Sequence, residues 1–151
     1  MDNTQLTEFI QTLDPAYDVK IGKQYVEVDL PPDKVRKISE TLRSADETWF
    51  DYLICLSGVD YGQDLGVVYH LGSSRYPHKL VLRTKTSDRE NPVLETVSDI
   101  WRTADFHERE VFDLLGIKFN NHPDLRRLFL TSSWGFPLRK DYKDDVNIVT
   151  K

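Results

Sequence analysis

Residues 105–142 constrain the fold of this chain more than any other part of the sequence. They read DFHEREVFDLLGIKFNNHPDLRRLFLTSSWGFPLRKDY, which begins as a charged amphipathic helix and continues as a long stretch without a regular period. The second part combines turn residues, basic residues and aromatic side chains, and a small domain does not need such a segment for its own core. We therefore expect an irregular C-terminal arm that lies on another surface, most readily that of a second protein.

The residues before this arm predict an α+β domain. Helical spacing of apolar side chains predicts helices over residues 6–13 and 35–45, and apolar alternation predicts strands over residues 17–21, 26–30, 65–71 and 80–86. The nearly continuous apolar run WFDYLICLS, residues 49–57, predicts a buried central strand. This order of elements is typical of a mixed or antiparallel sheet with helices packed on one face. We expect one such α+β domain over residues 1–117, and an extended basic and aromatic arm over residues 118–151 that is not an independent domain.

Apolar residues at steps of three and four predict a third helical stretch from residue 91 to residue 116. Gly116 follows the last apolar residue of this stretch, so we expect it to be the left-handed residue that ends the helix. The same spacing of three and four residues places Glu108 on the apolar face, where a carboxylate needs a partner. Three interpretations stay open: a new helix begins at Asp105 and Glu108 closes a capping box with it, Glu108 pairs with an arginine, or Glu108 has a catalytic role.

The sequence offers no established set of catalytic or metal-binding residues. Glu108 and Glu110 point in different directions on a helix, and Asp105, Arg109 and Asp113 are spaced as a solvated, self-paired ladder. Phosphate-loop, dinucleotide-binding and nucleophile-elbow motifs are absent, and the histidines lack ligand spacing; they are His70, His78, His107 and His122. An enzyme that uses Glu108 with His107 or His122 as acid and base is the catalytic alternative.

Charge and composition exclude several classes of protein. Residues 1–117 hold 13 basic and 21 acidic side chains, whereas residues 118–142 hold five basic and two acidic ones, so an acidic body carries a basic arm. A nucleic-acid-binding protein is usually basic over its whole binding face, so we expect no nucleic-acid partner. No apolar run approaches the roughly 20 residues of a membrane span, and the acidic N-terminus does not resemble a secretory signal. We expect Cys55 to be a buried structural thiol in a reducing compartment.

The arm carries residue types that are common at protein interfaces. Residues 120–124 have turn chemistry, and Arg126 and Arg127 follow directly, which suits bidentate pairing with carboxylates. Trp134 and its aromatic neighbour Phe136 are of the kind that anchors an interface. One alternative stays open, in which the arm folds back over its own sheet and Trp134 covers an open sheet face.

Three blocks of the sequence together resemble a known family. EREVFDLLG (108–116), HPDLRR (122–127) and GFPLRKD (135–141) look like the C subunit, of the 30 kDa type, of NADH–quinone oxidoreductase, which is respiratory complex I. The preceding α+β order is also similar to that family, whereas Lys143 stands where the family commonly has proline. The resemblance and the composition of the arm assign a partner-binding role to Glu108, Arg109, Glu110, Asp113, Gly116, His122, Pro123, Asp124, Arg126, Arg127, Trp134, Gly135, Pro137, Arg139, Lys140 and Asp141.

The resemblance implies a non-redox structural subunit of the hydrophilic arm of the complex. Such a subunit packs on the 49 kDa-type D subunit, which helps to form the quinone site, and on neighbouring hydrophilic-arm subunits. It has no catalytic, cofactor-binding or metal-binding residues of its own, since flavin, iron–sulfur clusters and quinone belong to other subunits. The expected location is peripheral, on the cytoplasmic side of the bacterial inner membrane. The alternatives are the equivalent small subunit of a membrane-bound hydrogenase or another complex I-like dehydrogenase, and a free-standing interaction adaptor.

Overall fold

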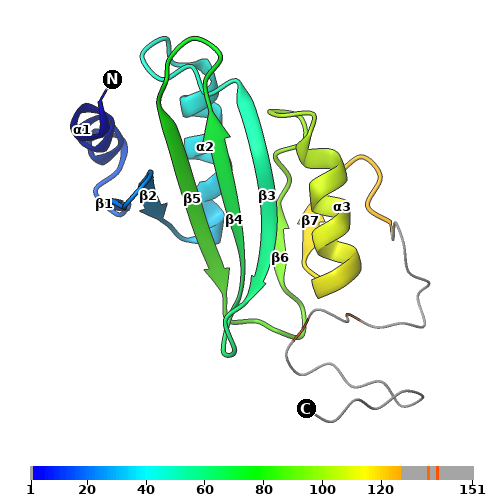
Figure 1. Ribbon diagram of the computed structural model, residues 1–151. Coiled ribbons are helices and arrows are strands. Elements are labelled where there is room, and N and C mark those ends of the chain that lie inside the picture. Colours follow the sequence, from blue (N-terminus) through cyan, green and yellow to red (C-terminus); the bar gives the residue numbers. More distant parts are fainter. Residues whose placement is uncertain (1, 127–135, 137–138, 140–151) are drawn as a thin grey trace.

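A computed structural model describes residues 2–126, 136 and 139, and Figure 1 shows the arrangement of its helices and strands. The elements along the chain are α1 (Asn3–Leu13), β1 (Asp18–Ile21), β2 (Val26–Asp29), the 3-10 helix η1 (Pro32–Lys34), α2 (Val35–Ser44), β3 (Tyr52–Asp60), β4 (Leu65–Gly72), β5 (Lys79–Thr86), β6 (Val93–Glu95), α3 (Ala104–Leu115) and β7 (Lys118–Asn120).

Five of the strands form one mixed sheet in the order β1-β2-β5-β4-β3. The β1–β2, β5–β4 and β4–β3 pairs are antiparallel, whereas β2 and β5 are parallel, because the chain leaves the first hairpin through α2 before it returns to the sheet. The short strands β6 and β7 pair in parallel beside this sheet. The predicted α+β class with a mixed sheet is therefore confirmed.

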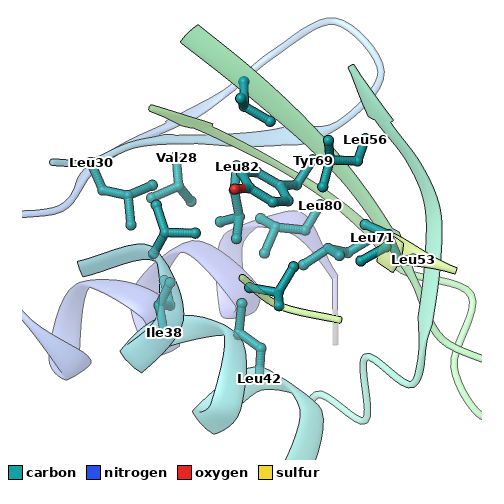
Figure 2. Close-up of a cluster of buried hydrophobic side chains, with 14 of the residues drawn as sticks. Val28, Leu30, Ile38, Leu42, Leu53, Leu56, Tyr69, Leu71, Leu80 and Leu82 are labelled. Carbon is teal, nitrogen blue, oxygen red and sulfur yellow. The ribbon is translucent and has the colours of Figure 1, made fainter. Parts of the chain in front are cut away.

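The core lies between one face of the sheet and the helices. Figure 2 shows apolar side chains of the strands converging on Ile38 and Leu42 of α2. Both α2 side chains are almost completely buried, as are Leu30, which directly follows β2, and the strand residues Val28, Leu53, Leu56, Tyr69, Leu71, Leu80 and Leu82. Helix α3 packs on the same face at β3, where a methyl group on Gly58 would collide with Leu115. The predicted one-sided packing of helices is confirmed.

Local sequence signals explain where the first two helices begin. Asp2 caps α1, since its carboxylate accepts a hydrogen bond from the Gln5 backbone N–H at 2.8 Å while the Gln5 side chain accepts from the Asp2 N–H. The helix ends before Pro15, as the sequence predicts. Pro32 opens the turn η1 that leads into α2, where a missing N–H costs no helical hydrogen bond.

The predicted buried central strand at residues 49–57 is wrong. The strand in this region is β3, which begins at Tyr52 and lies at the edge of the sheet. Its apolar run has two faces, because Leu53 and Leu56 enter the core whereas Tyr52 and Ile54 lie 58% and 44% exposed on the helix-free face. A bulge between Leu53 and Cys55 shifts the register of the β3–β4 pair.

The expectation of a buried thiol at Cys55 is also wrong. The residue is only half-buried, because the bulge in β3 turns it away from the helix side of the sheet. Its Sγ lies 3.1 Å from the Ser57 hydroxyl oxygen.

The predicted helical stretch from residue 91 to residue 116 is wrong over its first half. Residues 93–95 form β6, turns follow, and α3 begins only at Ala104. The apolar steps of three and four arise because a strand, a turn and a helix all direct apolar side chains at one core. Trp101, in the turn region, is one of these buried side chains, and its indole N–H donates to the Phe50 carbonyl at 2.9 Å. β7 lies past residue 117, where the arm was predicted to begin, and its pairing with β6 makes it part of the folded unit.

Candidate functional site

Helix α3 carries four of the ten residues assigned to partner binding that the structure describes: Glu108, Arg109, Glu110 and Asp113. Glu108 and Asp113 are completely buried, whereas Arg109 and Glu110 are partly exposed. The predicted self-paired ladder holds only in part: Asp105 and Arg109 approach to 3.9 Å, but Asp113 belongs to the interior and not to a solvated face.

The Glu108 carboxylate is bound by the loop that connects β6 to α3. One oxygen, Oε2, accepts a hydrogen bond from the Val97 backbone N–H at 3.0 Å, and the other, Oε1, makes a short hydrogen bond with the Thr96 hydroxyl. The capping-box and arginine-pair interpretations are therefore wrong, because α3 is capped at Thr103 without a side-chain hydrogen bond and no cation pairs with Glu108 among the described residues. The carboxylate ties a loop to the helix instead.

Burial changes the proton affinity of this carboxyl. Removal from water raises the pKa of Glu108 from an ordinary 4.5 to about 7, although the hydrogen bonds from Thr96 and Val97 act in the opposite direction. The nearby charges of Asp105 and Asp99 raise the pKa further. Tyr69 of β4 is also buried, and its hydroxyl finds no hydrogen-bond partner within residues 2–126, 136 and 139. Burial first and the Glu108 charge second raise the pKa of this tyrosine.

The HPD turn, residues 122–124, is fastened to the first turn of α3 by His122. The Asp124 backbone N–H donates to Nδ1 of His122 at 3.0 Å, so in the neutral ring the proton resides on Nε2. Nε2 lies 3.1 Å from the Asp105 backbone oxygen and 3.3 Å from its Oδ1. The side chain is fully buried, so His122 acts here as a hydrogen-bonding group, as its place in a turn suggests.

The C-terminal end of α3 contacts Phe136 and Arg139, the two residues of the arm that the structure describes beyond Arg126. Gly116 ends the helix with φ of 77°, which confirms the predicted left-handed conformation. Nε of Arg139 donates to the Leu115 carbonyl at 2.6 Å, and the ring of Phe136 lies 6.3 Å from that of Phe112. A Cβ atom on Gly116 would lie 2.6 Å from the Phe136 ring and 2.9 Å from Nη2 of Arg139.

The arginine at the end of the HPD turn is positioned differently. Arg126 is 68% exposed on its side chain and contacts only the similarly solvated Asp124, at 3.1 Å, among the ion pairs found between described residues. Pro123 is exposed beside it. Several residues assigned to partner binding lie outside the described residues: Arg127, Trp134, Gly135, Pro137, Lys140 and Asp141.

Sequence reasoning missed the residue of α2 that binds the loop between β6 and α3 on its solvent side. Arg36 of α2 donates to the Thr96 carbonyl at 2.9 Å and forms a bidentate pair with Asp99 at 2.8 and 2.6 Å. These groups, with Ser98 and Asn121, line a surface hollow of about 480 Å³. Arg36 and Thr96 are 60 positions apart in sequence, so no local pattern indicates the contact.

The described residues do not come together as an evident catalytic centre. Within the described part of the chain no three His, Cys, Asp or Glu residues gather as metal ligands, and no helix there is long and apolar enough to span a membrane. His122 is bonded to Asp105 and not to Glu108, so these two side chains do not form the acid–base pair of the catalytic alternative. What the geometry does present is a helix to which Glu108 and His122 fasten two loops near its N-terminal end, and whose C-terminal end binds Arg139.

Comparisons with known proteins agree with the motif blocks. Residues 28–146 match the family described as respiratory-chain NADH dehydrogenase, 30 Kd subunit. The C subunit of NADH-quinone oxidoreductase from Chlorobium phaeobacteroides is 40% identical over 132 residues, which cover 85% of this chain and 78% of that protein. The C subunit of the same enzyme from Chloroherpeton thalassium is 46% identical over 114 residues, covering 74% of this chain and 47% of the relative.

A longer relative and a solved structure extend the comparison. The C/D subunit of NADH-quinone oxidoreductase from Phocaeicola vulgatus is 46% identical over 122 residues, which cover 80% of this chain and 23% of that protein. This chain therefore spans about a quarter of that relative and about half of the one from Chloroherpeton. The same fold occurs in a chain of the membrane-bound sulfane sulfur reductase, an archaeal respiratory membrane complex, with a TM-score of 0.82 at 21% identity over 97% of this chain and 88% of that one.

The family match over residues 28–146 includes all three sequence blocks, and therefore the motif residues that α3 and the HPD turn carry. The chain belongs to the family of the 30 kDa subunit of respiratory-chain NADH dehydrogenase.

Proposed function

We propose that this chain is a non-redox structural subunit of the hydrophilic arm of a proton-translocating NADH–quinone oxidoreductase. In that role it docks on the 49 kDa-type D subunit at the quinone site and supports electron transfer from NADH to quinone. The observation that carries the proposal is the similarity to the relative named as a C/D subunit, whose match to this chain covers 23% of that protein. A domain that is joined to a D subunit in one relative is well suited to dock on a separate D subunit in another.

The proposed docking surface consists of Phe106, Asp124 and Arg126, at the end of α3 where the HPD turn is fastened. Phe106 is 49% exposed despite its apolar side chain, and it directly follows Asp105, to which His122 holds the turn. Arg126 projects into solvent at the end of that turn. Aromatic and arginine side chains are enriched at the energetic centres of interfaces. The exposed Arg126–Asp124 pair is worth little to the isolated chain, so a carboxylate of a partner can replace it.

The rigid attachment of the turn fits this role. His122 holds the turn on Asp105, and Glu108 holds the preceding loop on the same helix. A surface that is ordered before docking loses less conformational entropy when it binds. We propose that flavin, iron–sulfur clusters and quinone bind to other subunits, and that the chain is peripheral on the cytoplasmic side of the bacterial inner membrane.

Co-expression with the D subunit of the same organism tests the proposal. Arg126→Ala should leave the melting temperature of the isolated chain unchanged within about 1 °C, and it should weaken the complex by about 2–5 kcal/mol if a carboxylate on the D subunit is left buried and unpaired. Arg126→Lys should recover only part of the affinity, because lysine cannot form a bidentate pair. Lys37→Ala, which removes a cation on α2, is the control and should bind normally. Normal binding by Arg126→Ala contradicts the docking role of this residue.

The second candidate is the equivalent small subunit of another complex I-like membrane enzyme. The fold shared with a chain of the sulfane sulfur reductase complex favours keeping it. Purification of the tagged chain from native membranes, followed by assay with NADH and with reduced ferredoxin, distinguishes the two. A free-standing adaptor would instead be recovered without a quinone-site subunit.

A further inference from the structure

Glu108 is a buried carboxyl group with which no cation pairs among the described residues. Its side chain is completely buried, and its hydrogen bonds come from a backbone N–H and a hydroxyl group. An ionised carboxylate in such a place is costly unless a positive charge accompanies it, so the group favours its neutral form.

The hydroxyl groups beside Glu108 form a short relay that ends at the surface. Thr96 Oγ1 contacts Oε1 of Glu108 and lies 2.8 Å from Oγ of Ser98, while the Ser98 backbone N–H donates to Thr96 Oγ1 at 3.1 Å. Ser98 is partly exposed and lines the hollow of about 480 Å³ beside Asp99. The relay therefore connects a fully buried carboxyl group to solvent through two hydroxyl groups.

This relay satisfies both protonation states of Glu108. Thr96 has one hydroxyl proton, which cannot serve Glu108 and Ser98 at once. When Glu108 is protonated, it donates to Thr96, and Thr96 donates to Ser98. When Glu108 is ionised, the two hydroxyl groups rotate, so that Ser98 donates to Thr96 and Thr96 donates to the carboxylate. A proton can thus pass between Glu108 and the surface along the relay, but the ionised carboxylate that remains is buried without a cation, which disfavours the closed loop.

We infer that Glu108 is a buried proton-binding site, reached through the hydroxyl groups of Thr96 and Ser98, whose loss of the proton loosens the loop between β6 and α3. The loop is held on the helix side by the Val97 N–H bond to Glu108, and on the α2 side by Arg36. Water can reach the ionised carboxylate only if this loop opens, so deprotonation and loop opening are coupled.

The described charged and titratable groups of the neighbouring elements leave Glu108 without a positive charge to stabilise its ionised form. Asp105 of α3 and Asp99 of the loop both favour the protonated form, and Tyr69 of β4 supplies a buried hydroxyl group. Arg36 of α2 is engaged by Asp99 and the Thr96 carbonyl instead of Glu108. The pKa of Glu108 is correspondingly raised to about 7, which lies in the physiological range.

The direction of the pH dependence follows from the two states. The unfolded or opened chain loses the proton near the ordinary pKa of 4.5, whereas the closed chain keeps it until about pH 7. Between these values the closed state binds more protons, so its stability falls as pH rises. From pH 5 to pH 8 the equilibrium constant for closure should decrease by on the order of 10²-fold.

The test measures unfolding by urea from pH 5 to pH 8 for the whole chain and for Glu108→Gln. Glutamine preserves the acceptor for Val97 and does not ionise, so the ratio of the two folding constants should change by on the order of 10²-fold over this range. Glu110→Gln, on a partly exposed carboxyl of the same helix, is the matched control and should run parallel to the unmodified chain. Parallel curves for Glu108→Gln and the unmodified chain would overturn the inference.

A local measurement separates loop opening from a general effect on stability. Exchange of the Val97 amide proton, corrected for intrinsic base catalysis, should accelerate with pH in the unmodified chain and not in Glu108→Gln. The Phe50 amide lies in the loop before β3 and donates to the Leu42 carbonyl of α2, so its exchange rate should change with pH equally in the unmodified chain and in Glu108→Gln. If Glu108→Gln does not fold, the carbon-13 titration of the Glu108 carboxyl decides: a midpoint near 7 supports the inference, and one near 4.5 overturns it. The outcome does not depend on any partner protein.

Discussion

Replacing Gly116 with alanine should destabilise the chain by more than the conformational cost of a left-handed residue alone. With φ at 77°, an alanine there costs about 1–2 kcal/mol in backbone strain. The new Cβ atom would also lie 2.6 Å from the Phe136 ring and 2.9 Å from Nη2 of Arg139, so both side chains must move. Loss of the charged hydrogen bond from Arg139 to the Leu115 carbonyl adds about 1.5–3 kcal/mol, for a sum of about 2.5–5 kcal/mol.

Urea denaturation of four variants measures these contributions separately. Gly62→Ala is the matched control, since Gly62 has φ of 95° but nothing within 4 Å of an added Cβ, and it should cost only about 1–2 kcal/mol. Arg139→Ala should cost about 1.5–3 kcal/mol, and in its background Gly116→Ala should cost less than it does alone. Equal losses for Gly116→Ala and Gly62→Ala, with fully additive effects of Gly116→Ala and Arg139→Ala, would refute the account of this helix end.

Two further substitutions probe the packing and the pH response. Gly58→Ala should destabilise the chain by about 1–3 kcal/mol in thermal unfolding, because its Cβ would collide with Leu115 of α3, whereas Gly72→Ala, which meets only an exposed isoleucine side chain, should cost less. Burial lowers the pKa of His78, although its hydrogen bond to the Thr48 carbonyl acts in the opposite direction. As pH falls, His78 therefore becomes protonated in the unfolded chain before it does so in the folded chain, and the free energy of unfolding should decrease below about pH 6.5. Relative to His78→Gln, the unmodified chain should therefore lose stability as pH falls from about 7.5 to about 5.5, and equal slopes would contradict this assignment.

Periodicity predicts the parts of this fold in which one element buries one face. Alternation at residues 65–71 and 80–86 gives strands β4 and β5 almost to the residue, because each pleat directs every second side chain at the core. The pattern is ambiguous where successive elements share a core, so residues 93–115 resemble one helix although they form a strand, turns and a helix. An edge strand with apolar residues on both faces is similarly indistinguishable from a central strand, as residues 49–57 demonstrate.

The candidate site is predictable in its residue types but not in its contacts. The helical spacing of apolar residues in α3 identifies Glu108 as a buried carboxyl group that needs a partner. Its partners are a hydroxyl and a backbone N–H from the loop before α3, which the same spacing predicted to be helical. Arg139 has the character of an interface residue, yet its Nε donates to the carbonyl at the end of α3, so Arg139→Ala is predicted to lower the stability of the isolated chain. Contacts between distant positions such as Arg36 and Asp99 leave no local signal in sequence.

Site-specific photo-cross-linking in native membranes tests the proposed docking on the D subunit most directly. A photoreactive amino acid is placed at Phe106 or at Arg126 of the docking surface, and at Lys37 on α2 as a control. The account predicts cross-links to the D subunit from Phe106 and Arg126, and none to it from Lys37. Assembly of the labelled chain into the complex without a cross-link to the D subunit from either docking position would contradict it.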